Sequence, residues 1–213
     1  MIWFANTLWT SIGKKLLMAG TGLCFCGFIA IHLAGNLTLY GGGELFSAYT
    51  EKLHQLGILI PLTEWGLAGF ALIHVVLGIT LFYENFRARP VRYHIHKQAG
   101  GRTLGSATMP YTGFIILGFL IYHLLTFRFI GQTGVVLYQI VITSFNQPVL
   151  VIFYVITMMA VALHISHGFW SAFQTLGADH VKYSPVIKGI CTVFYLVVAI
   201  GFGSIPIYLL LSP

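Results

Sequence analysis

The chain has 213 residues, of which 57% are hydrophobic and 8% charged, and its mean hydropathy is +0.86. A soluble globular domain carries about 25% charged residues, so this chain has too little polar surface to cover a water-soluble globule. These values exclude a disordered tail, a nucleic-acid-binding protein and a secreted disulfide-rich scaffold. We therefore expect an integral membrane protein with a single membrane domain over residues 1–213.

Five stretches are long and apolar enough to cross a bilayer as helices. A membrane-spanning helix needs about 20 apolar residues to cover about 30 Å of hydrocarbon. Segments with turn residues or charge lie between the stretches. The predicted spans are 15–40, 61–83, 109–129, 148–173 and 188–211. The sequence therefore predicts an all-α protein with five transmembrane helices.

Lysine and arginine are distributed unevenly over the connecting segments, and such a bias sets the orientation of membrane helices. With the N-terminus inside, only Lys52 and Arg128 fall in outer segments. The inner segments contain Lys14, Lys15, Arg87, Arg89, Arg92, Lys97, Arg102, Lys182 and Lys188. We expect the N-terminus in the cytoplasm and the C-terminus outside. The basic residues would act as a topology signal and could also dock a peripheral partner, and no nucleic-acid partner is expected.

Histidines inside the predicted spans are the most informative residues, because an ionisable side chain in a membrane is costly and usually functional. They are His32, His74, His123, His164 and His167. His32 and His123 lie near the outer ends of their helices, whereas His74 and His164 lie nearer the inner face. Depth therefore sorts four of them into an outer pair, His32 with His123, and an inner pair, His74 with His164.

Two imidazoles that face each other in apolar surroundings usually hold a six-coordinate haem b for electron transfer. Two pairs predict two haem b groups within a bundle of the first four helices. Zinc is disfavoured, because no cysteine or carboxylate accompanies the histidines. The alternative is that the histidines bond neighbouring helices or relay protons. Depth does not decide between His164 and His167, which share a helix face.

Several segments resemble the cytochrome b subunit of succinate dehydrogenases and fumarate reductases. They are SIGKKLLMAGTG (11–22), HLAGNL (32–37), ARPVRY (88–93), TMPYTG (108–113) and HISHGFWSAFQTLG (164–177). The resemblance extends over residues 11–211 and is closest to the five-helix, dihaem branch that works with menaquinone. It implies a prokaryotic inner-membrane protein that anchors a flavoprotein and an iron–sulfur subunit at its cytoplasmic face and exchanges electrons with a quinone.

The resemblance also implies roles for individual residues. The iron ligands would be His32 and His123 for the outer haem, and His74 and His164 for the haem nearer the iron–sulfur subunit. The family's ligand is the first histidine of the H-x-x-H-G motif, which favours His164 over its neighbour. Some relatives carry a glutamate two residues before this ligand, where this chain has Ala162. A proton path through that position is therefore not expected.

A quinone couple moves two protons with its two electrons, so its site needs a proton carrier. Relatives place a carboxylate in the outer segment after the first helix, which here falls near Glu51 and His54. Glu64, at the start of the second helix, is a further candidate, although the helix dipole alone favours an acid there. We predict a menaquinone site on the outer side, beside the haem held by His32 and His123.

Donors for the propionates of the inner haem are expected near the inner surface. The candidates at suitable depth are Lys14, Lys15, Ser106, His167, Gln174 and Lys182.

The leading hypothesis is the dihaem membrane subunit of a succinate:menaquinone or menaquinol:fumarate oxidoreductase, whose complex could form dimers. The dicarboxylate chemistry would belong to partner subunits, because this chain has no dinucleotide fingerprint and no cysteine cluster. The alternatives are a haem-b anchor of a hydrogenase or formate dehydrogenase, and a haem-free transporter or structural anchor. Broken helices or an internal repeat would favour a transporter. We expect no internal repeat between corresponding segments of this chain.

Overall fold

The computed structural model describes residues 7, 9–88, 103–130 and 133–212, and these residues form helices without any strand. Five helices are long and apolar enough to cross a membrane, which confirms the predicted fold class. They are α2 (Ser11–Asn36), α4 (Leu59–Arg87), α5 (Leu104–His123), α7 (Pro148–Thr175) and α8 (Ser184–Leu211). The chain is therefore an all-α, multi-pass membrane protein. Arg89, Arg92, Lys97 and Arg102, and most of the ARPVRY segment, lie outside the described residues.

Local sequence signals explain where several of these helices begin. The Thr10 side chain caps α2 by accepting a hydrogen bond from the Gly13 backbone N–H at 3.1 Å. Thr103 and Ser106 form a capping box at the start of α5. Such caps satisfy backbone N–H groups that have no partner within the helix. Pro148 stands in the first turn of α7, where its missing N–H costs nothing.

The first helical segment is longer than predicted. A 3-10 turn (Leu37–Gly41) follows α2, and α3 (Gly42–His54) then runs on from it. Gly42 has φ 82°, a left-handed conformation that favours glycine, and it marks the change of direction between the turn and α3. The sequence predicted no helix between the span that ends at residue 40 and the span that begins at residue 61, whereas the structure has α3 there.

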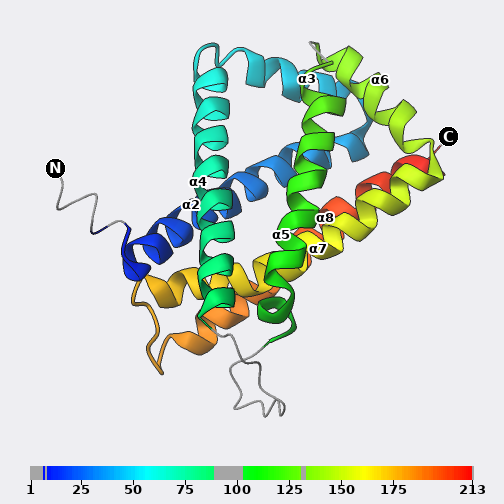
Figure 1. Ribbon diagram of the computed structural model, residues 1–213. Helices are drawn as coiled ribbons and strands as arrows, with labels where there is room; N and C mark the ends of the chain where they lie inside the picture. The colour runs from blue at the N-terminus through cyan, green and yellow to red at the C-terminus, as the bar shows by residue number, and fades with distance from the viewer. Residues whose placement is uncertain (1–6, 8, 89–102, 131–132, 213) are drawn as a thin grey trace.

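A second short helix, α6, was also missed. Helix α6 (Gly134–Phe145) has 12 residues and follows a π-helical turn (Leu124–Arg128) at the end of α5. Its sequence is apolar, but 12 residues extend only about 18 Å as a helix, which is too short to span the hydrocarbon. A search for spanning segments therefore passes over it. Helices α3 and α6 pack against each other at the top of the view in Figure 1.

Helices α2 and α7 form the centre of the bundle. Helix α2 packs against α4 and α7, and α7 also packs against α5. Helix α8 covers α7 and α2, where Cys26, Met158 and Val198 belong to one apolar cluster. The only described residue of α4 that is buried is Leu77. In Figure 1, α4 stands upright and apart from α5, while α7 and α8 run obliquely.

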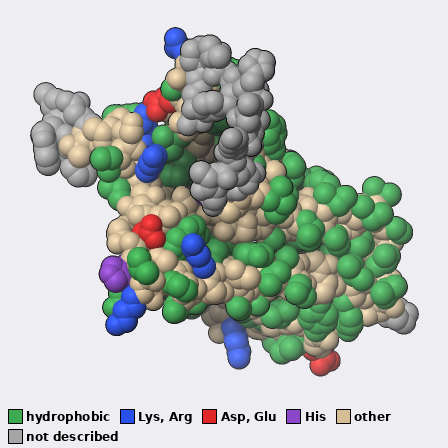
Figure 2. Space-filling model, turned by 90° about the horizontal axis from the view of Figure 1, so that it is seen from below, with side chains coloured by type: hydrophobic (Ala, Val, Ile, Leu, Met, Phe, Trp, Pro, Cys, Tyr) green, Lys and Arg blue, Asp and Glu red, His purple; other side chains and the backbone are tan. Residues whose placement is uncertain are grey.

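The outer surface of the bundle is suited to lipid. Large hydrophobic side chains such as Leu72, Ile156 and Ile200 are exposed, and Figure 2 shows hydrophobic side chains spread over much of the molecule while Lys and Arg gather toward one side of the view. Charged residues that lie between helices are paired. Lys14 of α2 is buried and donates to Glu84 at the far end of α4.

The sequence contains an internal repeat that joins equivalent helices of the structure, so the expectation that none exists is wrong. The pattern M-x-x-T-G-x-x-x-x-G-F-x-x-x-H occurs in α2 as residues 18–32 and again in α5 as residues 109–123. The following spans share a second pattern, H-x-x-x-G, at 74–78 in α4 and 164–168 in α7. The chain therefore consists of two similar units, α2–α3–α4 and α5–α6–α7, followed by α8.

Contacts between the two units are reciprocal, as in a two-fold symmetric interface. Gly43 of α3 packs against Tyr138 of α6, whose ring lies 2.9 Å from an ideal Cβ placed on the glycine. Gly134 of α6 packs in the same way against the backbone of Ser47 in α3, at 3.0 Å. Both glycines, and both of the residues they contact, are 91 positions apart (134 − 43 and 138 − 47). The units are thus related by an approximate two-fold axis that passes through the α3–α6 crossing.

The close approach at this crossing makes Gly134 sensitive to substitution. In Gly134→Ala the new methyl group would collide with the Thr50 hydroxyl of α3 and crowd the Ser47 backbone at 3.0 Å, and overpacking of this kind costs about 1–3 kcal/mol. We expect a lower unfolding temperature in detergent than for the wild type. Gly189→Ala in α8 is the matched control, because a Cβ at Gly189 meets nothing within 4 Å. Equal unfolding temperatures for the two variants would contradict the crossing as described.

Candidate haem-binding site

The structure brings together the outer histidine pair that depth predicted. The rings of His32 (α2) and His123 (α5) lie 6.0 Å apart between centroids and are nearly perpendicular, at 88°. Each ring stacks on a phenylalanine one turn earlier in its own helix, Phe28 at 5.2 Å and Phe119 at 5.5 Å. Phe28 and Phe119 are equivalent residues of the internal repeat. The same stacking contact, with a phenylalanine four residues earlier, therefore orients both outer histidines.

The inner pair is His74 (α4) and His164 (α7), whose ring centroids lie 6.4 Å apart at an interplanar angle of 58°. Equivalent glycines flank these rings. An ideal Cβ on Gly22 or on Gly113 would lie 3.5 Å from Cε1 of His74 or His164, respectively. Both pairs thus join alternate helices of the bundle, as the sequence predicted. That these histidines bind iron stays a prediction.

A threonine holds each ring of the inner pair. Thr21 Oγ1 lies 3.0 Å from His74 Nδ1 and 2.8 Å from the carbonyl oxygen of Leu17 in the preceding turn. Because the hydroxyl has one proton and donates it to the carbonyl, its oxygen accepts from Nδ1–H. This arrangement forms two hydrogen bonds, whereas a hydroxyl that donated to Nδ1 would form one. His74 Nε2 is then unprotonated, which is the form that binds a metal.

The second unit repeats this arrangement. Thr112 Oγ1 lies 3.1 Å from His164 Nδ1 and 3.1 Å from the carbonyl oxygens of both Thr108 and Met109. The same proton count leaves His164 Nε2 free. Both inner rings therefore have an unprotonated Nε2, and their centroids lie 6.4 Å apart.

The spacing of both pairs fits a six-coordinate haem. An imidazole nitrogen binds a metal at about 2 Å and the ring centre lies about 1.1 Å behind it, so two imidazoles on opposite sides of one iron have centres about 6.2 Å apart. The observed separations are 6.0 and 6.4 Å. Among the described residues, no group of three or more His, Cys, Asp or Glu converges as a protein-only metal site would require. The donor set is therefore two isolated imidazole pairs.

The two pairs lie at different depths on one axis. Eleven residues separate Thr21, which contacts the inner pair, from His32 in the outer pair, and eleven separate Thr112 from His123. At about 1.5 Å per residue the two levels are about 16 Å apart along the helices. Because equivalent residues of the two units face each other, the approximate two-fold axis passes between the members of the outer pair and of the inner pair.

Geometry distinguishes His164 from His167. The ring of His164 faces His74 and is bonded to Thr112. His167 lies one turn further along α7, against Gly105 in the first turn of α5, where a Cβ on the glycine would be 3.1 Å from the His167 Cβ. The structure therefore places His164 in the inner pair and His167 beside it, on the inner side.

The other haem-environment candidates do not converge on the inner pair. Lys15 is exposed. The Ser106 hydroxyl belongs to the capping box of α5. Lys182 lies over the Tyr183 ring at 5.6 Å. Gln174 Nε2 donates to Asp179 at 3.3 Å, and hydrogen bonds from Ser184 and then from Gln174 hold the pKa of Asp179 below its usual value.

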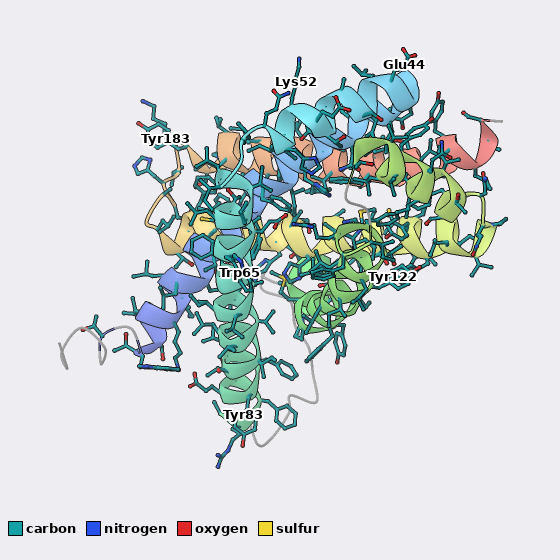
Figure 3. All side chains as sticks on the ribbon, turned by 90° about the horizontal axis from the view of Figure 1, so that it is seen from above. Glu44, Lys52, Trp65, Tyr83, Tyr122 and Tyr183 are labelled. Atoms are coloured by element: carbon teal, nitrogen blue, oxygen red, sulfur yellow. The ribbon has the colours of Figure 1, made fainter. Side chains whose placement is uncertain are left out.

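The three quinone-site candidates lie on two helices, Glu51 and His54 on α3 and Glu64 on α4. Glu51 and His54 are exposed in the last two turns of α3. Glu64 of α4 is paired with Arg128, whose Nε and Nη2 donate to its two carboxylate oxygens at 2.6 and 2.8 Å. Glu51 lines a groove of about 430 Å³ between α3 and α6. Figure 3 shows Lys52 and Glu44 on the same helix projecting away from the bundle.

Sequence reasoning missed several residues that contact the histidines. They are Thr21, Phe28, Thr112, Phe119 and Tyr154, whose hydroxyl lies 3.3 Å from His123 Nδ1. The repeated pattern would have identified the first four, because each stands at a fixed distance from a histidine in both units.

Comparison with known proteins adds no family: no family model, curated protein or solved structure matches the chain. The function is therefore argued from the site itself.

Proposed function

We propose that the chain is the dihaem cytochrome b membrane anchor of a succinate:menaquinone oxidoreductase or menaquinol:fumarate reductase. The observation that carries this proposal is the presence of two histidine pairs, at ring separations of 6.0 and 6.4 Å, stacked at two depths of one bundle. Two haem b groups bound there would supply one-electron transfer between the two sides of the membrane.

The residues of each pair have complementary tasks. The four imidazoles would hold the two haems, two rings to each haem, so that the iron would transfer electrons without binding oxygen or a substrate. Thr21 and Thr112 keep Nε2 of the inner ligands unprotonated. Phe28 and Phe119 stack on the outer histidines and orient their rings. The apolar bundle thus supplies pre-oriented neutral ligands in a medium of low polarity.

The proposed partner subunits would carry the cofactors for which this chain has no sequence motif. Without a dinucleotide fingerprint or a cysteine cluster, flavin and iron–sulfur centres would reside on separate subunits. The basic ends of α2, α4 and α8 would face these subunits at the cytoplasmic surface of a prokaryotic inner membrane. Menaquinone would exchange electrons and protons at the opposite side, near the outer pair.

A transporter is the competing function, and the internal repeat removes one argument against it, since many transporters contain repeats. The other hallmark is a helix that unwinds at the midplane around a polar substrate. Among the described residues, α2, α4 and α7 run unbroken past both histidine levels. The rings are moreover aimed at each other in pairs, which favours a shared ligand between them.

The pairing is tested by removing one ligand at a time. His32→Ala or His123→Ala should abolish the outer haem and leave one haem per chain, with the inner haem unchanged in its reduced-minus-oxidised spectrum. His74→Ala or His164→Ala should abolish the inner haem instead. The spectra are recorded on membranes containing the whole complex.

Two histidines provide matched controls for this series. His180→Ala, in the exposed loop before α8, and His167→Ala, one turn from His164, should both retain two axially ligated haems. If His32→Ala or His123→Ala keeps both haems, the outer pair is not a haem site and the proposal fails.

The outer quinone site is tested by neutralising its three candidate proton carriers. Glu51→Gln, His54→Gln and Glu64→Gln should each lower quinone turnover with both haems present, by about 100-fold for the group that transfers the proton. Lys52→Gln is the control, because Lys52 lies beside Glu51 and projects outward (Figure 3). Wild-type turnover in all three variants would rule out the site as drawn.

A further inference from the structure

We propose that Thr21 and Thr112 are positioning residues that set the redox potential of the inner haem by accepting the Nδ1 protons of its two ligands. This inference rests on the proposed function, because it concerns the two histidines expected to bind that haem. Neither threonine touches the site of any substrate, and both would act through His74 and His164.

The first argument is that each threonine has no proton left to donate to its histidine. Thr21 donates to the Leu17 carbonyl at 2.8 Å and Thr112 to carbonyls one turn earlier at 3.1 Å, while their oxygens lie 3.0 and 3.1 Å from Nδ1. An intrahelical bond thus converts each hydroxyl into a fixed acceptor. Both threonines are buried, so no water competes for this role.

The second argument is the recurrence of the arrangement. The same T-G dipeptide, 91 positions apart (112 − 21), meets the histidine of the following span in each unit. The two intervening loops and helices differ in sequence and packing. A contact that persists at 3.0 and 3.1 Å despite these differences indicates a constraint on the histidine itself.

The consequence is electronic as well as steric. An imidazole whose Nδ1–H is shared with an acceptor is a more basic ligand at Nε2. A more basic ligand binds the ferric ion in preference to the ferrous ion, and two such ligands act together at the inner site. Hydrogen bonds of this kind are among the protein's means of tuning haem potentials.

The outer pair lacks this arrangement. His123 Nδ1 meets the Tyr154 hydroxyl at 3.3 Å, and the polar neighbour of the His32 ring is Asn36, at 3.4 Å from Nε2. In the described contacts, neither neighbour is a hydroxyl that donates its proton to a carbonyl of its own helix, as Thr21 and Thr112 do. The threonines should therefore affect the inner haem and leave the outer haem unchanged.

The test compares Thr21→Val and Thr112→Val in the whole complex by a redox titration of the haem spectrum and by electron paramagnetic resonance of the ferric haems. Valine keeps the shape of threonine and removes the acceptor. We expect a tenfold loss of ferric preference at the inner haem in each variant, which corresponds to a midpoint potential about 59 mV more positive. Thr21→Ser and Thr112→Ser retain the hydroxyl and should restore the wild-type potential.

Thr157→Val is the matched control, because Thr157 is a buried threonine in α7 that donates to the Phe153 carbonyl and forms no hydrogen bond with a histidine in the described residues. If a valine variant does not accumulate, Thr21→Cys and Thr112→Cys carry the test, since a thiol is a weaker acceptor and should give a smaller positive shift.

The outcomes separate this inference from the proposed function. Loss of the inner haem alone in the valine variants, with both haems kept in Thr157→Val, supports positioning by the threonines. Two haems with an inner potential and resonance spectrum equal to those of Thr157→Val would overturn the inference. Absence of haem from the wild-type complex would overturn the proposed function as well.

Discussion

A histidine ring inside a membrane has two nitrogens that need partners, and this requirement governs the arrangement of the bundle. An unpaired polar group in hydrocarbon costs several kcal/mol. At the inner level Thr21 and Thr112 accept from Nδ1 of the two rings, which leaves both Nε2 atoms unprotonated. The protein thus satisfies one nitrogen of each inner ring, and in the proposed function the other nitrogen would bind the shared haem. If the two inner imidazoles were bonded only to each other, a threonine hydroxyl beside each ring would not be needed.

The approximate two-fold axis explains why the histidines pair as they do. Since equivalent residues face each other, His32 meets His123 and His74 meets His164, and the two sites stack on the same axis. Helix α8 breaks the symmetry by covering α7 and α2. As a result α7 buries residues along its length, such as Tyr154 and Ile165, whereas its equivalent α4 buries only Leu77 among the described residues. The difference in burial between α4 and α7 is therefore due to packing of α8, whereas the positions of the histidine pairs are due to the internal repeat.

Hydropathy predicts the spanning helices, and the depth of each histidine predicts the pairs, because both depend only on position along a helix. Helix α6 was missed because 12 apolar residues are too few to cross a membrane, although they suffice to pack on α3. The roles of Thr21 and Thr112 depend on which faces of α2 and α5 meet α4 and α7. Sequence patterns do not show which helix faces contact each other. The repeat, by contrast, was present in the sequence and hidden by the variable apolar residues between its matching positions. The ion pair that engages Glu64 depends on Arg128 of another helix and could not be inferred from the helix start alone.

The central claim is that the axis of the bundle carries two haem b sites. The most direct measurement is the haem content per chain of the purified complex, combined with a redox titration of its reduced-minus-oxidised spectrum. The account predicts two haem b per chain that titrate as two separate components. A complex that contains one haem would show that only one pair is a ligand pair, and a complex without haem would contradict the account and leave the histidines as partners in helix packing or proton transfer.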